Sequence, residues 1–155
     1  MKRQTPGMSL KTVLTPRRGN VISIEPTSDL RTAAKLLSVH DIGAVAVLDD
    51  GGRIVGILSE RDCVRKLELQ DRAAATTQVR DIMTSNVLSV RPDQAVEECR
   101  KVMGDARIRH LSVVDGERVV GVLSSKDILD EIIAEDEKII KELETERLVT
   151  TSGLY

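Results

Sequence analysis

A seven-residue segment occurs twice in this chain, at residues 56–62 (GILSERD) and again at residues 121–127 (GVLSSKD). Each copy has a glycine, two apolar residues, a serine, two further residues of which the second is a cation, and an aspartate. Each follows an apolar run and precedes a helix-like stretch, so we interpret it as a junction between a strand and a helix, where free backbone N–H groups point outward. We call these segments the first and the second junction. A repeated unit constrains the architecture of a chain more than any other sequence feature.

The similarity extends upstream of both junctions. Residues 20–26 match residues 86–92, and residues 41–49 match residues 107–115, both with an offset of 66 positions. The offset becomes 65 at the junctions, because the first turn, at 50–53, is one residue longer than the second, at 116–118. A true structural repeat tolerates such a difference when it is confined to a turn. The chain therefore consists largely of two copies of one unit.

A unit of about 65 residues is near the lower limit for an independent core, so the two copies are expected to bury their apolar faces against each other. Apolar runs, caps and turns predict the order β-α-β-β-α in each copy, and the fold class α+β. In the first copy we expect strands at 21–24, 42–48 and 54–58, with helices ending near 39 and 69. In the second copy we expect strands at 87–90, 108–114 and 119–123, with helices at 94–105 and from 125 onward. Both helices of a copy should cover one face of its sheet.

We divide the chain into five parts on this basis. They are a basic N-terminal arm (1–19), the first repeat (20–70), a connector (71–85) with a short helix and turn at 79–84, the second repeat (86–134), and a C-terminal helix extension with its tail (135–155). The arm has five cations and no acid before residue 20, and its residues 10–14 are candidates for a short helical turn that docks. Otherwise the arm is interpreted as a loosely ordered terminus.

The last helix is expected to continue beyond its repeat, to about Glu146. Its apolar residues fall near one face: Ile132, Ile133, Ile139, Ile140 and Leu143. Asp136 interrupts this stripe, which argues against a long coiled coil. With no core left in its own repeat, the helix should pack either on the other repeat or on another subunit. We expect a homodimer.

Composition and charge exclude several classes of function. The net charge of −2 does not favour a partner with a phosphate backbone, so no nucleic acid is expected. No apolar run approaches the roughly 20 residues that span a bilayer, and no secretory signal opens the chain, so we expect a cytoplasmic protein without membrane contact. Cys63 and Cys99 have no metal-type spacing and suit a reducing compartment. The two histidines are too few for a typical zinc site, and no metal site is expected.

With these motifs the chain resembles a tandem pair of CBS domains, also called a Bateman module. The resemblance rests on the doubled pattern Val-x-Ser-[Ile/Val]-x-Pro, on an apolar strand that ends in Asp, and on the two junctions, and it covers residues 20–133. It implies two β-α-β-β-α units that pack with pseudo-two-fold symmetry around a cleft. No catalytic domain is attached, as in the stand-alone proteins of the family.

The resemblance implies that adenosine-containing ligands bind in that cleft: AMP, ADP, ATP, S-adenosylmethionine or NAD(H). It assigns ribose to the junction aspartates and serines, and phosphates to the adjacent cations; these residues are Asp62, Ser59 and Arg61, and Asp127, Ser124 and Lys126. It assigns the adenine to strand residues, which are Val21, Ile22, Ser23, Ala44 and Val122 for one site, and Val87, Leu88, Ser89, Arg109 and Ile57 for the other. A carboxylate suits the two donors of a cis-diol, and a helix N-terminus with a cation suits phosphate.

Two structural alternatives stand beside this assignment. Ser-x-x-Asp before an apolar helix is also a capping box, and capping does not exclude ribose binding. Arg109 and His110 occupy the positions that hold Gly43 and Ala44 in the first repeat, so the two sites cannot be equivalent. The pair is either a phosphate clamp or a hydrogen-bonded pair at the end of a strand. Cys63, next to Asp62, is interpreted as a buried thiol without redox function.

The sequence thus predicts a non-catalytic adenine-nucleotide sensor, because no set of nucleophile, base and orienting group is present. Ligand binding would change how repeats and subunits pack, and an unidentified regulated protein would respond. The alternatives are a redox sensor for NAD(H) and a structural adaptor with empty clefts. Hydrolysis of a bound nucleotide is disfavoured, since no metal-carboxylate cluster is evident.

Overall fold

The computed structural model describes residues 9–10 and 21–153. The first repeat contains β1 (Ser23–Ile24), α2 (Leu30–His40), β2 (Ala44–Leu48), β3 (Ile54–Ser59) and α3 (Glu60–Leu69). A short helix in the connector, α4 (Val79–Ile82), precedes the second repeat. That repeat contains β4 (Ser89–Val90), α5 (Val96–Ala106), β5 (His110–Asp115), β6 (Arg118–Ser124) and α6 (Ser125–Ser152). The predicted order β-α-β-β-α is therefore confirmed in both copies.

Each repeat forms a three-stranded sheet with the same topology. The orders are β1-β2-β3 and β4-β5-β6, and in each sheet the first pair of strands is parallel and the second antiparallel. The pairing registers also agree, since Ser23 pairs with Ala46 as Ser89 pairs with Ser112. Even the register shift recurs at matching positions, after Val47 and after Val113. The repeat in the sequence is thus a repeat in hydrogen bonding, and the α+β fold class is confirmed.

Several boundaries differ from the sequence-based expectation. β1 and β4 have two residues each instead of four, because only these residues lie beside a parallel partner. α5 begins at Val96, two residues later than expected, since the side chain of Gln94 accepts a hydrogen bond from the backbone N–H of Arg91 at 2.8 Å and belongs to the preceding turn. α6 continues to Ser152 instead of ending near Glu146.

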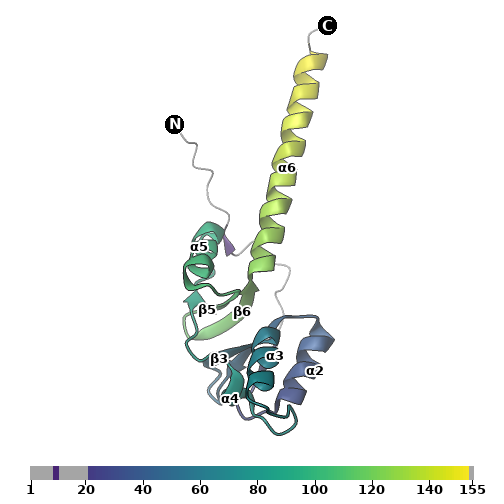
Figure 1. Cartoon of the computed structure of the whole chain (residues 1–155). Helices are drawn as coiled ribbons and strands as arrows, with labels where there is room; N and C mark the ends of the chain where they lie inside the picture. The colour runs from purple at the N-terminus through teal and green to yellow at the C-terminus, as the bar shows by residue number, and fades with distance from the viewer. Residues whose placement is uncertain (1–8, 11–20, 154–155) are drawn as a thin grey trace.

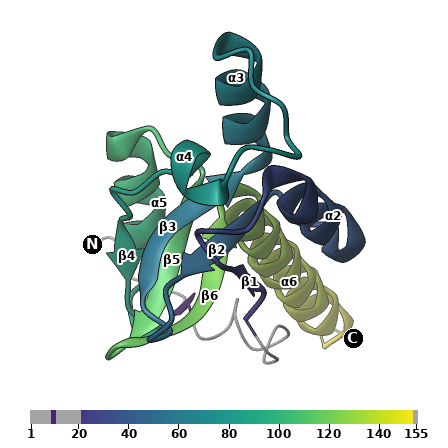
Figure 2. The same ribbon diagram turned by 90° about the horizontal axis from the view of Figure 1, so that it is seen from below.

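The two repeats stack with their sheets toward each other. Figure 1 shows α2 and α3 with β3 in the lower part of the molecule, and α5 with β5, β6 and the first turns of α6 above them. In Figure 2 the strands of both repeats occupy the centre, and β2 contacts β6 across the boundary. Each repeat nevertheless keeps its own apolar cluster, one around Val45, Val47 and Leu58 and the other around Leu111, Val113 and Leu123.

The segments that precede the repeats are exchanged between them. Val79, in the connector before the second repeat, is fully buried in the core of the first, where its N–H donates to Ser28 O at 2.8 Å. Leu10, before the first repeat, is fully buried in the core of the second, where its N–H donates to Gln94 O at 3.0 Å. Ser28 and Gln94 are matching positions of the repeat. This exchange links the two repeats into one unit. Of the helical turn expected at residues 10–14, only Leu10 lies within the described residues, and it does dock.

The end of the connector pairs with the free edge of β3. Ile57 and Thr84 exchange two backbone hydrogen bonds, at 3.0 and 2.9 Å. This approach requires a glycine at position 56, because a Cβ there would lie 2.4 Å from Met83 Sδ and 3.1 Å from Thr84 O. The pairing directs the chain that follows along the boundary between the repeats.

The long helix α6 leaves the body of the molecule after about two turns. Ile128 is buried and Ile132 packs against the second core, but residues 133–152 are exposed. Figure 1 shows this part of the helix projecting away from both sheets. The alternative in which the extension packs on the first repeat is therefore wrong. Within the described residues, no helix combines the length and the apolar character that crossing a membrane requires.

Candidate ligand-binding site

Both junctions form complete capping boxes. In the first, Ser59 Oγ accepts from the backbone N–H of Asp62 at 3.0 Å, and Asp62 Oδ2 accepts from the N–H of Ser59 at 3.4 Å. In the second, Ser124 Oγ accepts from the N–H of Asp127 at 3.0 Å, and Asp127 Oδ2 accepts from the N–H of Ser124 at 2.9 Å. The capping interpretation is confirmed. In each aspartate the capping bond uses Oδ2 only, so capping leaves a second carboxylate oxygen for other contacts.

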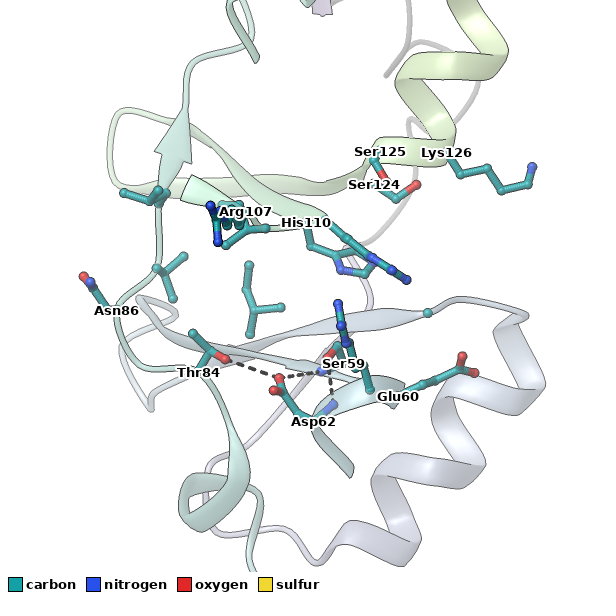
Figure 3. A pocket seen from close by; sticks show the side chains of 17 residues that line it. Ser59, Glu60, Asp62, Thr84, Asn86, Arg107, His110, Ser124, Ser125 and Lys126 are labelled. Carbon is teal, nitrogen blue, oxygen red and sulfur yellow. Dashed lines mark hydrogen bonds between the residues drawn. The ribbon is translucent and has the colours of Figure 1, made fainter. Parts of the chain in front are cut away.

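A pocket of about 450 Å³ lies between the repeats and includes residues of both junctions. It is lined by residues 59–62 of the first junction, by 124–126 at the second, by 107–110 at the entry to β5, and by 86–88 after the connector, together with Gly43, Ile57 and Thr84. Figure 3 shows the first junction on one side of the pocket and Ser124 and Ser125 on the other. The pocket therefore depends on both repeats.

The structure brings ten of the predicted site residues together in this pocket: Ser59, Arg61, Asp62, Ile57, Val87, Leu88, Arg109, His110, Ser124 and Lys126. These include four of the five residues assigned to one adenine site. The other seven do not line it: Asp127, Ser89, Val21, Ile22, Ser23, Ala44 and Val122. None of the five residues assigned to the other adenine site lines the pocket, and one of them, Ala44, is buried. Asp127 forms the capping box with Ser124, and its negative charge acts to raise the pKa of His110.

The carboxylate of Asp62 is held at the edge of the pocket from several directions. Its Oδ2 also accepts from Thr84 Oγ1 at 3.3 Å, and its Oδ1 lies 3.6 Å from Lys66 Nζ. Lys66 in turn donates to the carbonyl of Ile82 at 2.7 Å. The connector thus positions the side chain that the family resemblance assigns to ribose.

His110 lies between the two junctions, as Figure 3 shows. Burial is the largest effect on it and lowers the pKa of the imidazole below its usual value; the nearby carboxylate of Asp127 opposes the shift, and the cation of Arg109 adds to it. The ring is therefore mostly neutral at pH 7. No side-chain hydrogen bond links Arg109 with His110 in the part of the chain that the structure describes, so the hydrogen-bonded-pair alternative is not observed.

The lining carries more positive than negative charge. Its cations are Arg61, Arg107, Arg109 and Lys126, and its carboxylates are Glu60 and Asp62. Among the described residues none of the three arginines is engaged in an ion pair, whereas Lys126 Nζ lies 2.7 Å from Asp130 and the side chain is 81% exposed. In Figure 3 Lys126 points away from the pocket. The arginines, more than Lys126, are placed to receive an anion.

Several lining residues were missed by the sequence-based assignment, among them Thr84, Asn86 and Arg107. Thr84 lies in the connector, outside both repeated units, so the repeat does not point to it. Arg107 could not be assigned to the site from the sequence either, because its placement depends on the left-handed backbone (φ 54°) that ends α5.

The structure offers little for metal or thiol chemistry. Among the described residues, no group of three or more His, Cys, Asp or Glu side chains is arranged to hold a metal ion. Cys63 is only partly buried, where the sequence analysis expected a buried thiol. This burial, assisted by the charge of Asp62, still raises the pKa of the Cys63 thiol, so this cysteine is a poor nucleophile at neutral pH.

Comparison with known proteins identifies the repeats. The family model described as CBS domain matches residues 10–69 and 79–134. Among curated proteins, the chain is 38% identical over 109 residues to a 33.4 kDa protein encoded in a ribosomal RNA operon of Thermofilum pendens, which covers 70% of this chain and 35% of that protein. It is 32% identical over 115 residues to the mitochondrial CBS domain-containing protein CBSX3 of Arabidopsis thaliana, covering 72% of this chain and 56% of that protein. The chain thus spans less than two thirds of these relatives.

Solved structures agree with this match. A chain with CBS domains from Burkholderia ambifaria is 35% identical with a TM-score of 0.77, covering 82% of this chain and 95% of the other. The CBS domain pair of protein MJ0100, solved with 5-methylthioadenosine and S-adenosyl-L-methionine, is 28% identical with a TM-score of 0.74, covering 84% and 99%. CBSX2, solved with AMP, is 26% identical with a TM-score of 0.68, covering 84% and 99%.

Proposed function

Because the chain belongs to the CBS-domain family, we propose that it is a non-catalytic regulatory protein that binds an adenine nucleotide (AMP, ADP or ATP) in the pocket between its repeats. The observation that carries this proposal is the composition of that pocket, to which the first repeat contributes Asp62 and the second repeat contributes Arg107 and Arg109. A nucleotide needs these two chemistries at opposite ends, an acceptor for the ribose hydroxyls and cations for the phosphates.

The remaining walls suit a purine base. Ile57, Val87, Leu88 and Ile108 present aliphatic side chains to the pocket. The described residues include no aromatic side chain, since the only aromatic residue of the chain is Tyr155. The base would therefore be held by aliphatic contact and by backbone groups, without ring stacking. The ligands of MJ0100 and CBSX2, which all contain adenosine, support this class of ligand.

A regulatory role follows from the position of the pocket. A ligand that contacts Asp62 in the first repeat and Arg109 in the second would bind best to one arrangement of the two repeats and would stabilise it. A partner protein that recognises this arrangement would then respond to the nucleotide, in a cytoplasmic protein acting as a homodimer. Allostery in this sense requires that the ligand bind two arrangements with unequal affinity.

The proposal is tested by thermal unfolding of the wild type and Asp62→Ala with AMP, ADP, ATP, NADH, NAD and S-adenosylmethionine. A ligand at a hundred times its dissociation constant should stabilise the protein by about 2.7 kcal/mol, which raises the midpoint by several degrees. Asp62→Ala should abolish the rise, because it removes the ribose acceptor.

The substitution also removes a helix cap, so a matched control is needed. Asp29 caps α2 by accepting from the N–H of Thr32 at 2.8 Å, and it does not line the pocket. Asp29→Ala should lower the midpoint without ligand, yet keep the full rise with ligand. A structural adaptor with an empty cleft would show no rise with any nucleotide in any variant. A rise with NADH that exceeds the rise with AMP would favour the redox sensor.

A further inference from the structure

The projecting part of α6 has an apolar face that nothing in the described chain covers. Residues 133–152 form about five helical turns in solvent, and Ile133, Ile140 and Leu143 are 47%, 56% and 59% exposed. Figure 1 shows how far this part lies from both sheets. Helices in proteins are stabilised mainly by packing of such a face, so an extension of this length indicates a partner.

The face has the spacing of a coiled-coil core. Its residues alternate at intervals of four and three positions: Leu129, Ile133, Asp136, Ile140, Leu143, Arg147 and Thr150. Two members are charged, and their signs are opposite. Neither Asp136 nor Arg147 forms an ion pair in the part of the chain that the structure describes. Leu148 and Val149 lie off this face.

The charges distinguish the two directions in which a second α6 could lie. A parallel pair in register would place Asp136 against Asp136 and Arg147 against Arg147, and like charges at core positions oppose association. An antiparallel pair centred between residues 141 and 142 places Asp136 against the partner's Arg147, twice. The same centre places Ile140 against the partner's Leu143. The residue that breaks the apolar stripe thus acquires a partner of opposite charge.

The length of the projecting helix fits this register. With the same centre, residue 131 lies opposite residue 152 of the partner, so the end of one helix meets the place where the other leaves its body. Ile132 packs against the second core, and exposure begins at Ile133. The overlap therefore uses the whole extension, about 33 Å of helix. Glu137 comes near the partner's Glu144, but at the solvated rim, where salt screens the repulsion.

We propose that a second copy of this chain covers this face, as an antiparallel pair of α6 helices centred between residues 141 and 142, with reciprocal Asp136–Arg147 contacts. The two CBS pairs then lie at opposite ends of the helix pair. The contact defines the homodimer suggested above, and it does not depend on nucleotide binding.

The test is sedimentation velocity of the full chain over a range of concentrations. The wild type should dimerise, and Ile140→Glu should prevent it. Asp136→Arg and Arg147→Asp should each raise the dimer dissociation constant at least about tenfold, because each places like charges in contact. The double variant Asp136→Arg/Arg147→Asp should restore the affinity to within about threefold of the wild type, since the pair is re-formed with its signs exchanged.

Matched controls come from the opposite face of α6, where Glu142→Arg and Lys138→Asp make the same charge changes and should leave the dimer intact. Circular dichroism shows whether each variant remains folded. A monomeric wild type, or a dimer that tolerates Ile140→Glu, would overturn the proposal. A double variant that fails to recover would overturn the antiparallel register. The nucleotide-induced thermal shift should persist in every α6 variant, so failure of the dimer is distinguishable from failure of the nucleotide site.

Discussion

The imidazole of His110 lies against the backbone of Gly43, where an added Cβ would be 3.6 Å from Nε2. The two residues come from different repeats, since His110 begins β5 and Gly43 directly precedes β2, and both line the pocket. A neutral histidine in a cluster of arginines is expected to respond when an anion enters. The first two predictions follow from this position.

Nucleotide affinity should depend on pH through His110. Burial lowers the pKa of the free imidazole, and bound phosphates would raise it, so binding takes up a proton and the affinity should increase as pH falls through about 6.5. The AMP phosphate titrates in the same range, so the dissociation constant should be compared between wild type and His110→Gln by calorimetry from pH 5.5 to 8. His40→Gln, on the exposed end of α2, is the control. Identical pH profiles for wild type and His110→Gln would remove His110 from the phosphate site.

The stability of the protein without ligand should change with pH in the opposite direction to the affinity, decreasing as pH falls. The lowered pKa of folded His110 means that the unfolded chain binds the proton more readily, so this contribution is complete above the unfolded pKa and is lost as pH falls below it. Urea unfolding of the wild type should therefore show a decrease in stability below about pH 6.5 that is smaller in His110→Gln. Equal slopes in the two proteins would contradict the buried neutral state.

Arg109→Gln should weaken binding of AMP but not of adenosine. The side chain lines the pocket and makes no ion pair with another described residue, so its loss removes a contact with phosphate alone. A hydrogen bond to a charged group contributes about 1.5–3 kcal/mol, which corresponds to about tenfold or more in the dissociation constant. Arg91→Gln, at an exposed ion pair with Asp93, is the matched control and should have no effect. Equal losses for AMP and adenosine would place Arg109 elsewhere than at the phosphates.

Leu10→Ala should destabilise the second repeat although residue 10 precedes the first. Leu10 is fully buried in the core that contains Leu111 and Leu123. Truncation of a buried leucine costs about 2–5 kcal/mol, measurable by urea unfolding. The exposed Leu148→Ala should change the stability by less than about 0.5 kcal/mol. A small effect of Leu10→Ala would mean that the exchanged segment contributes little to that core.

Two glycine substitutions should have opposite effects. Gly56→Ala forces a Cβ against Met83 Sδ and the carbonyl of Thr84, so it should cost about 1–3 kcal/mol and weaken nucleotide binding by displacing the connector. Adding Met83→Ala should recover only part of the stability, because the backbone carbonyl remains. Gly104→Ala, within α5 and with no atom nearby, should stabilise by about 0.5–1 kcal/mol. Unchanged stability and binding in Gly56→Ala would show that the connector can shift freely.

The local features of this protein were accessible from its sequence. The two copies, their β-α-β-β-α order and the capping boxes at Ser59 and Ser124 depend on residues close together in the chain, and each is specified by spacing, turn residues and caps. The offset between the two copies is constant, and their equivalent strands pair in equivalent registers. The sequence repeat therefore also describes the pairing within the two sheets. Most of the residues that line the pocket were also predicted, since each copy marks its own junction.

Tertiary structure decided what the repeat leaves open. Arg109 and His110 show in the sequence that the two sites differ, but not which of them joins the pocket. Only one predicted adenine set does so, and Arg107 and Thr84 complete it from other elements. The exchange that buries Leu10 and Val79 in opposite cores joins positions far apart in sequence, and no local spacing encodes such a contact. The exposure of α6 beyond Ile132 likewise depends on where the core ends. Packing between distant segments, which minimises exposed apolar area over the whole chain, determines these three features.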